Sequence, residues 1–440
     1  MIREHEDVRD YLSSVCSQIR ARELHKDIRR ELESHLEELV LDKEAEGASR
    51  EEAVAWAIRQ MGDPVTVGRE LHRIHKPRMH WGLLLGLIAF LGLGVFVMYS
   101  IESSYGAMSP YVYGNFFSTN KLRFIALGLP VLLVFYFMDY RKLKTWSLLM
   151  YCLAAASMIY VLLFGQQVSG AKSYLSIWRF SIDVKTVSSY LFIAAAAGLL
   201  LDWWKQKRYF WLKSIVSFVL VPFVLYAMVP SVSAILFYLV SYGILCGVIT
   251  RKWWLALLQT GGLLLMCAAV VITISHRYMK YRLGAFLDPF ADSSGGGYMY
   301  IRMREALSSA GWWGHGFGAV NPKLQFIHED FIFTYLVYSF GWGVGIAVAG
   351  AAVYFVTRML HSMGQARETY GKMLIVAAAS IIGAQFGYCI GMSLGVLPIT
   401  SVTFPFVSYG GTHTLMEMAI VGLVLGIYRR KDMIRLSKTF

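Results

Sequence analysis

The sequence is poor in cysteine, and the few cysteines it has are not spaced for a structural task. Their number is odd, no CxxC pair occurs, and they are scattered along the chain as Cys16, Cys152, Cys246, Cys267 and Cys389. Most lie inside apolar runs, where a thiol behaves as a small hydrophobic group. The spacing therefore indicates neither a disulfide framework nor a zinc site.

A long apolar run is missing from the first 80 residues. This region is strongly charged and lacks the apolar core of a signal peptide, so we expect no such peptide. The whole chain of 440 residues is nevertheless 56% hydrophobic. That composition is typical of an integral membrane protein.

Acidic side chains are scarce beyond residue 80. Residues 81–440 contain 12 Asp or Glu against 28 Lys or Arg, a net charge of +16, whereas residues 1–80 contain 17 against 14, a net charge of −3. Much of the basic excess lies at the ends of apolar segments, so the positive-inside rule explains it better than nucleic acid, and we expect no nucleic-acid partner. Five of the 12 acids fall between positions 276 and 330. We interpret this stretch as a candidate for chemistry or as a solvated connecting loop.

Ten apolar segments follow residue 80; several are near the ~20 residues that a bilayer span needs, while a few are nearer ~16 and borderline. They lie at about 81–100, 122–138, 146–164, 186–201, 214–229, 231–250, 253–275, 331–357, 373–393 and 413–428. With ten spans, the Lys/Arg clusters between them fall on one side together with both termini, which makes that side cytoplasmic. The predicted fold is all-α: a polytopic domain over 81–440 with ten transmembrane helices and an outward loop at 276–330.

Two further segments have their own patterns. Residues 397–411 contain two prolines and a glycine pair, which indicates an outer loop that partly re-enters the membrane. Residues 1–80 predict a small cytoplasmic helical domain, because Leu32, Leu36, Leu39 and Val40 share one helical face and Ser49 to Glu52 forms a capping box. Docking is the default interpretation of this prefix domain.

Several motifs in the membrane domain resemble those of the SEDS family, which comprises RodA, FtsW and SpoVE. VSYGG (407–411) follows FPF, LP lies at 397–398, VMYS at 97–100, and a GxGxG pattern at Gly314, Gly316 and Gly318. The loop matches at Asp288, Pro289, Asp292, Gly295, Gly297, Tyr298, Ala306, Gly311, His328 and 330–333. The resemblance covers about residues 82–430 and implies a ten-span bacterial enzyme that polymerises cell-wall glycan.

The sequence departs from the family at several positions. The family's basic-aromatic pair is Ser173-Tyr174 here, its Gln-Pro-Ser-Glu motif is replaced by residues 183–186, and the following lysine falls on Ser189. A Pro-Asp-Leu-Gly stretch is reduced to residues 230–233, and the acidic pair of the eighth span becomes Tyr338-Ser339. The chain is therefore a divergent member, with changes in the region expected to bind the donor substrate.

The resemblance implies that Asp292 is the general base for an inverting reaction on lipid II, with undecaprenyl diphosphate as leaving group. The alternative is that Asp292 caps its own loop, as Asp before Ser and Gly commonly does. Asp288, before a proline, is interpreted as structural. Expected substrate-binding residues are Lys172, Arg179, Tyr298, Arg302, Arg304, Ser408, Tyr409, Gly410 and Gly411. For the basic residues, solvated surface positions are an equally good interpretation.

No set of protein ligands marks a metal site, although a divalent cation, Mg²⁺ or Mn²⁺, bridging Asp292 and the diphosphate would suit the oxygen-rich chemistry. His315 and His413 lack partners at metal-ligand spacing and are interpreted as structural. Glu329 and Asp330 are interpreted as favourable charges at a helix N-terminus. Glu417 is an intramembrane acid that either has a function or hydrogen-bonds to a neighbouring helix.

The resemblance implies a multi-pass protein of the bacterial cytoplasmic membrane that works with lipid II and a single-span class B penicillin-binding protein, a transpeptidase. Because of the departures, a second hypothesis stays open: a non-catalytic member that binds a lipid-linked precursor or scaffolds cell-wall proteins. A third, lipid flipping or transport, would need a polar path that the sparse charges of the first seven spans do not offer.

Overall fold

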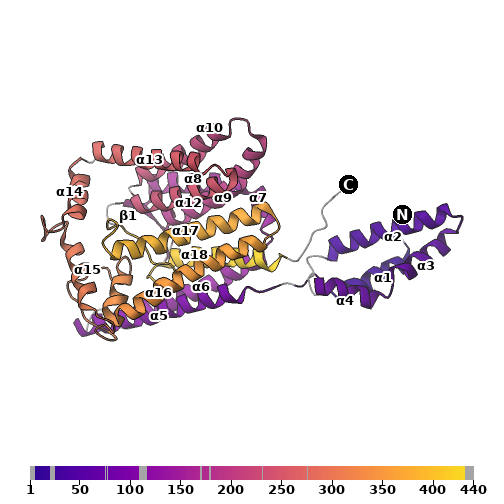
Figure 1. Cartoon of the computed structure of the whole chain (residues 1–440), viewed down its shortest axis with the longest axis horizontal. Coiled ribbons are helices and arrows are strands. Elements are labelled where there is room, and N and C mark those ends of the chain that lie inside the picture. The colour runs from indigo at the N-terminus through magenta and orange to yellow at the C-terminus, as the bar shows by residue number, and fades with distance from the viewer. Residues whose placement is uncertain are drawn as a thin grey trace. The chain divides into compact units, whose positions relative to one another are not determined.

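The computed structural model describes residues 5–19, 25–74, 76, 78–108, 116–168, 171–177, 180–229, 231–274 and 276–431. The chain separates into two compact units: Met1–His80 together with the stretch from Ile427 onward, and Trp81–Gly426. Figure 1 shows the helices that make up each unit.

The prefix unit is built from four helices, α1 (Glu6–Ser17), α2 (His25–Ala45), α3 (Arg50–Met61) and α4 (Pro64–Ile74). The capping box is present, since Glu52 N–H donates to Ser49 Oγ at 3.4 Å and Ser49 N–H donates to Glu52 Oε2 at 3.2 Å. Of the apolar face predicted on α2, Leu32, Leu36 and Val40 are buried in the core of this unit, and Leu39 packs against it. Periodicity and capping therefore predicted α2 and the start of α3 correctly, while α1 was not predicted.

The second unit is a bundle of long apolar helices that run roughly side by side (Figure 1). They are α5 (Trp81–Met108), α6 (Phe116–Phe137), α8 (Ser147–Phe164), α9 (Val184–Gln206), α10 to α11 (Phe210–Met228, through a π-helical turn at Val216–Leu220), α12 (Val232–Thr250), α13 (Trp253–Ile274), α16 (Ile332–Gln365), α17 (Thr369–Ser393) and α18 (Gly411–Arg429). A short helix, α7 (Arg141–Thr145), links α6 and α8.

Nine helices in the described part of the chain are long and apolar enough to cross a membrane. The predicted span at 253–275 coincides with α13, a 22-residue helix without a charged residue, several of whose side chains lie outside the described set. The mostly helical, membrane-type fold is confirmed, whereas ten spans and cytoplasmic termini stay predictions.

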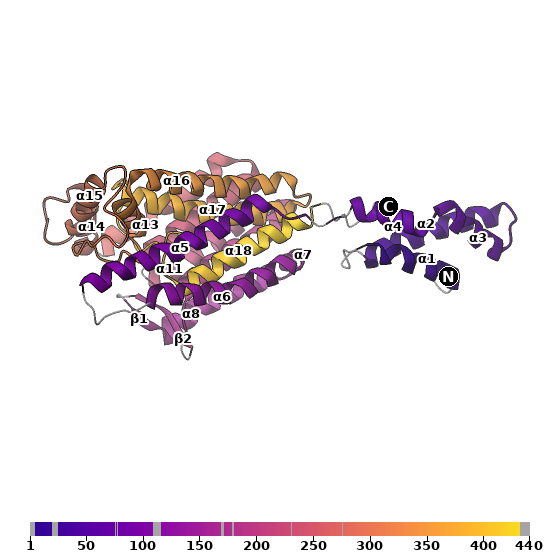
Figure 2. The same ribbon diagram turned by 90° about the horizontal axis from the view of Figure 1, so that it is seen from below.

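Small residues let α6 and α18 approach closely, and Figure 2 shows the two helices running alongside each other. A Cβ at Gly426 would lie 2.8 Å from the carbonyl oxygen of Tyr136, and one at Gly411 would lie 2.7 Å from the Phe124 ring. Contacts this short leave no room for a side chain. The glycines therefore fix how α18 packs, which matters because α18 begins at the candidate site.

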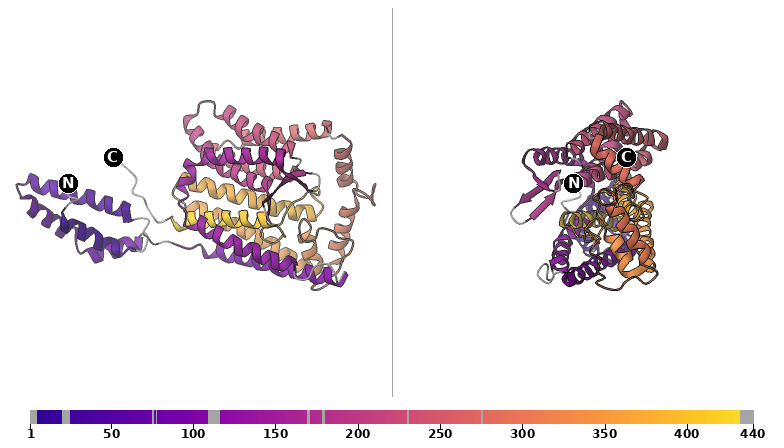
Figure 3. Two further views of the ribbon diagram at one scale, coloured as in Figure 1. Left: turned by 180° about the vertical axis from the view of Figure 1, so that it is seen from behind. Right: turned by 90° about the vertical axis from the view of Figure 1, so that its left-hand side faces the viewer.

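One end of the bundle carries the sheet and the long connecting segments of the described residues, and we call it the loop end. A three-stranded antiparallel sheet, β1 (Gln166–Val168), β2 (Ala171–Ile177) and β3 (Phe180–Asp183), lies there and was not predicted. The predicted polar loop at 276–330 is partly helical, with α14 (His276–Leu287) and α15 (Tyr298–Ser309) running across the loop end (Figure 3). Residues 394–410 contain no helix, but Phe404 and Phe406 are buried against Phe386 and Phe355 of the bundle.

Candidate functional site

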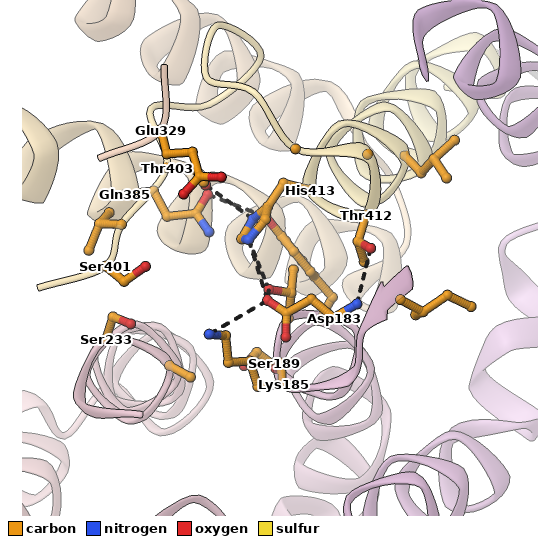
Figure 4. Close-up of a pocket in the computed structure, with 18 of the residues that line it drawn as sticks. Asp183, Lys185, Ser189, Ser233, Glu329, Gln385, Ser401, Thr403, Thr412 and His413 are labelled. Carbon is orange, nitrogen blue, oxygen red and sulfur yellow. Dashed lines mark hydrogen bonds and ion pairs between the residues drawn. The ribbon is translucent and has the colours of Figure 1, made fainter. Parts of the chain in front are cut away.

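A cavity of about 640 Å³ opens among the helix ends at the loop end. Its walls come from α6, β2 and β3, the first turns of α9 and α12, the segment before α16, α17, the 401–403 loop and the start of α18. Its polar lining residues include Asp183, Lys185, Thr186, Glu329, Asp330, Gln385, Ser401, Thr403, Thr412 and His413. Figure 4 labels all of them except Thr186 and Asp330. Groups from segments up to 230 residues apart therefore meet in one place.

Asp183, where β3 ends and α9 begins, is the most buried acid of this cavity, with 3% of its surface exposed. Its Oδ2 accepts a hydrogen bond from Thr186 Oγ1 at 2.8 Å and lies 3.6 Å from His413 Nε2 and 3.9 Å from Lys185 Nζ. Its backbone N–H donates to Thr412 Oγ1 at 3.1 Å. Asp183 thus ties the sheet and α9 to the start of α18.

His413 is held at both ring nitrogens. Nδ1 lies 3.1 Å from Thr403 Oγ1, and Nε2 lies 3.1 Å from Thr186 Oγ1. Figure 4 shows the ring lying between Thr403 and Asp183. The structural interpretation of His413 was therefore incomplete, because the ring lines a polar cavity rather than filling apolar space.

Glu329 and Asp330 form an acidic pair beside these groups. Asp330 does not cap α16; its Oδ1 instead accepts from the Val402 N–H at 3.0 Å and from Ser401 Oγ at 3.3 Å. Burial, and then the neighbouring Glu329, raise the pKa of Asp330 to about 7. Asp330 therefore changes its charge near neutral pH, in contact with the loop that forms one wall of the cavity.

The raised pKa of Asp330 predicts a stability that falls as the pH rises. The folded protein holds this proton more tightly than the unfolded chain, so the stabilisation is present at pH 4 and is lost as the pH passes about 7. In Asp330→Asn the free energy of unfolding should depend less on pH. The difference between low and neutral pH should shrink by roughly 2–4 kcal/mol, since one pKa unit corresponds to about 1.4 kcal/mol. Thermal unfolding of both proteins between pH 4 and 8 measures this difference. If stability fell equally with pH in wild type and in Asp330→Asn, Asp330 would not be the titrating group.

Asp292 lies in the loop between α14 and α15 and does not line the cavity. Its carboxylate accepts from Tyr281 Oη at 2.6 Å, from the Gly296 N–H at 2.8 Å and from the Gly295 N–H at 3.1 Å. These bonds, that of Tyr281 first, lower the pKa of Asp292. The local geometry is that of a carboxylate capping its own loop, and it keeps Asp292 ionised.

The loop of Asp292 is connected to the cavity wall through α15. The N–H of Ile399 donates to Tyr300 Oη at 2.8 Å, and Ile399 lies two residues before the cavity-lining Ser401. On the same helix, Arg302 pairs with Glu305 at 2.6 Å and its guanidinium lies over the Tyr298 ring at 4.8 Å. One hydrogen bond therefore joins α15 to the segment that leads into the cavity-lining residues 401–403.

The other predicted binding residues are distributed over the loop end. Arg304 is exposed on α15 and Lys172 is exposed on β2, neither lining the cavity, while Arg179 lies outside the described residues. Tyr409, Gly410 and Gly411 do line the cavity. Ser408 is buried, where its hydroxyl donates to the Glu329 carbonyl and accepts from the Phe404 N–H, both at 2.8 Å.

Two fully buried side chains of opposite charge, Lys121 and Glu417, lie behind the cavity. The sequence had indicated only Glu417. Lys121 Nζ of α6 donates to the Ser408 carbonyl at 2.8 Å and to Thr414 Oγ1 at 3.1 Å. Glu417 Oε2 of α18 accepts from the Phe406 N–H at 2.7 Å. These two described side chains make no direct salt bridge, and their opposite charges interact over a longer distance. Together they fasten the 404–408 segment between α6 and α18.

No group of three or more His, Cys, Asp or Glu that could hold a metal ion occurs among the residues that the structure describes. A divalent cation would therefore need oxygen ligands from a substrate in addition to a carboxylate.

Comparison with known proteins identifies the family. Residues 81–433 match the family model for FtsW, RodA and SpoVE, described as cell cycle proteins. The chain belongs to this family. A "Probable peptidoglycan glycosyltransferase FtsW" of Thioalkalivibrio sulfidiphilus is 28% identical over 376 residues, which cover 82% of this chain and 92% of that protein.

Solved structures agree with the assignment to the FtsW/RodA/SpoVE family at the level of fold. The rod shape determining protein RodA of Thermus thermophilus has a TM-score of 0.59 at 18% identity and covers 80% of this chain and 97% of its own. A chain from a peptidoglycan synthase complex, described as coordinating polymerisation and crosslinking, has a TM-score of 0.66 at 20% identity and covers 80% and 98%. The match covers the membrane unit of a multi-pass membrane protein.

Proposed function

We propose that this protein is a peptidoglycan glycosyltransferase that polymerises lipid II into glycan strands. Membership of the family and the names of its relatives support this class of reaction. The observation that carries the proposal is the polar cavity of about 640 Å³ at the loop end, where acidic, basic and hydroxyl side chains meet beside the membrane-spanning helices. A lipid-linked sugar needs this combination of an apolar flank for its chain and polar groups for its head.

In the proposed reaction, Asp292 is the general base. The proton of the attacking sugar hydroxyl passes to the Asp292 carboxylate, the hydroxyl oxygen bonds to the anomeric carbon with inversion, and the bond to undecaprenyl diphosphate breaks. The lowered pKa of Asp292 keeps it deprotonated at neutral pH, which is the state that a general base needs before it accepts a proton. The link from Tyr300 to Ile399 is a physical route by which α15 could close Asp292 onto a substrate in the cavity.

The leaving diphosphate needs positive charge nearby. Lys172, Arg302 and Arg304 at the loop end, together with Lys185 in the cavity wall, are the basic groups that the chain offers there. A divalent cation, Mg²⁺ or Mn²⁺, held by Asp292 and the diphosphate would supply further charge neutralisation, in the manner in which Mg²⁺ commonly binds with one or two carboxylates and substrate phosphates.

This chemistry takes place at the outer face of the bacterial cytoplasmic membrane, with ten spans and both termini in the cytoplasm. Basic residues at the opposite end of the bundle, such as Arg141, Lys144 and Lys205, support this orientation. A class B penicillin-binding protein would crosslink the product, as the related synthase complex of polymerisation and crosslinking suggests.

A second candidate function is binding of lipid II without catalysis, as a scaffold of the cell-wall machinery. The departures at Thr186, Ser189 and Tyr338-Ser339 favour it, because they remove charged groups that the family carries at the expected donor site. Polymerisation of purified lipid II distinguishes the two functions: glycan strands support the enzyme, whereas binding without strands supports the scaffold.

Deletion of residues 1–75 should leave the intrinsic rate of polymerisation within about twofold of wild type. The cavity is lined entirely by residues of the second unit, so the prefix unit contributes nothing to it. Polymerisation by detergent-purified full-length and truncated proteins, compared at equal amounts of folded protein, measures the effect. A well-folded truncated protein without activity would contradict a purely docking or regulatory role.

A further inference from the structure

Four side chains that line the cavity form a continuous polar chain, which runs from the buried carboxylate of Asp183 to the hydroxyl of Thr403. Asp183 Oδ2 is 2.8 Å from Thr186 Oγ1, Thr186 Oγ1 is 3.1 Å from His413 Nε2, and His413 Nδ1 is 3.1 Å from Thr403 Oγ1. Asp183 is 3% exposed, and its other oxygen, Oδ1, has no hydrogen-bond partner. A buried carboxylate with an unpaired oxygen costs stability, so a purely structural purpose explains this group poorly.

The protons available to these four side chains fix the direction in which each hydrogen bond is donated. An ionised carboxylate only accepts, so the single hydroxyl proton of Thr186 points to Asp183. Thr186 Oγ1 can then only accept from the imidazole, and His413 must carry a proton on Nε2. Asp183 therefore sets the tautomer of His413 through Thr186, although the two residues are 230 positions apart.

The far end of the chain leaves bonding capacity at Thr403. If the His413 ring is neutral, the Thr403 hydroxyl donates to Nδ1 and keeps both of its lone pairs free. If the ring is charged, Thr403 accepts from Nδ1 and keeps one free lone pair and its proton. In both states Thr403 can accept one more hydrogen bond. Its side chain lines the cavity, so a bound ligand can supply the donor.

The ligand at Thr403 must be able to form a hydrogen bond with it whether the His413 ring is neutral or charged. A sugar hydroxyl both donates and accepts, so it pairs with Thr403 whichever way the chain is protonated. A phosphate oxygen only accepts, and the three carboxyl groups of Asp183, Glu329 and Asp330 outnumber the one lysine that lines the cavity, Lys185, whose Nζ already lies 3.9 Å from Asp183 Oδ2. The surroundings thus favour a neutral, hydroxyl-bearing ring over a phosphate at this position.

We propose that Thr403, oriented by the chain Asp183–Thr186–His413, is the binding group for a sugar hydroxyl of the lipid-linked substrate. This inference rests on the proposed function for the identity of the substrate. It assigns Thr403 a positioning role, separate from the base Asp292, and it gives a purpose to residues 183–186, where the sequence departs from the family pattern.

The test compares two probes, lipid II and undecaprenyl diphosphate, which share the lipid diphosphate and differ in the sugar. Binding to the full-length protein in nanodiscs is measured for wild type, Thr403→Val and Thr403→Ser. We expect Thr403→Val to weaken lipid II binding five- to tenfold, the effect of one lost hydrogen bond, and to change undecaprenyl diphosphate binding less than twofold. Thr403→Ser, which keeps the hydroxyl, should bind both probes as wild type does.

The matched control is Thr357→Val, which removes a hydroxyl from an exposed position of α16 where it only donates to the Tyr354 carbonyl. Equal weakening of both probes, or no weakening of either, by Thr403→Val would overturn the proposal. Because binding is measured without turnover, a wild-type protein that fails to polymerise lipid II would refute the proposed function while leaving this test decisive.

Discussion

Asp292→Asn should lower the rate of lipid II polymerisation at least 100-fold while the protein remains folded. An amide cannot take the proton of the attacking hydroxyl, and a positioned general base contributes about 10² to 10⁴ in rate. The Gly295 and Gly296 N–H groups donate to different oxygens of Asp292, so the single carbonyl oxygen of Asn can keep one of these two bonds and the loop loses part of its support. The measurement is glycan-strand formation, with thermal unfolding to verify the fold.

The control for this variant is Asp288→Asn in the same loop. Asp288 Oδ1 accepts from the Phe290 N–H at 3.2 Å, which is a local turn contact, and Asp288 does not line the cavity. Both substitutions remove one negative charge from the loop, so an electrostatic effect would appear in both. Activity retained in Asp292→Asn, or lost equally in the two variants, would exclude Asp292 as the base.

Lys121→Met should lower the free energy of unfolding of the membrane unit by about 3–5 kcal/mol. This is the largest loss of stability that we expect from a single substitution in this protein. Lys121 and Glu417 are fully buried in neighbouring helices. Removing the lysine leaves the Glu417 carboxylate without its opposite charge, and an uncompensated buried charge is what makes breaking such a pair costly. Thermal unfolding in detergent or nanodiscs measures the loss.

The double variant Lys121→Met/Glu417→Gln should recover much of that stability, because it removes both charges and keeps an acceptor for the Phe406 N–H. Lys144→Met is the matched control. Lys144 pairs with Asp202 at 2.8 Å at a partly exposed position, where such a pair contributes less than about 1 kcal/mol. Similar losses for Lys121→Met and Lys144→Met would show that the buried pair does not hold the 404–408 segment.

Much of the helical fold could be predicted, because it depends on patterns that are local in sequence. Uninterrupted apolar runs such as Met373–Ser393 specify a helix in a membrane, where every backbone group must bond within its own segment. The capping box at Ser49 also depends on neighbours only three residues apart. The sheet at 166–183 lacks such a signal, since its strands are three to seven residues long and Tyr174 pairs with Asp183, nine positions away.

The candidate site was harder to predict, because its contacts are not local. The SYGG stretch led to Tyr409, Gly410 and Gly411, which do line the cavity. His413 lacked partners at metal-ligand spacing in the sequence, yet its hydrogen-bond partners are Thr403 and Thr186, which lie 10 and 227 positions away. Asp183 drew attention only as a departure from the family. The sequence feature that could have indicated Asp183 is an acidic residue directly before a predicted span, at the position where the family motif is replaced.

Polymerisation of lipid II by the purified full-length protein tests the central claim most directly. The reaction would contain Mg²⁺ or Mn²⁺ and candidate class B penicillin-binding proteins, with Asp292→Ala run in parallel. We expect glycan strands with the wild-type protein and none with the variant. Lipid II that binds to the wild-type protein but yields no strands with any partner would contradict the enzymatic function and favour a binding or scaffolding protein.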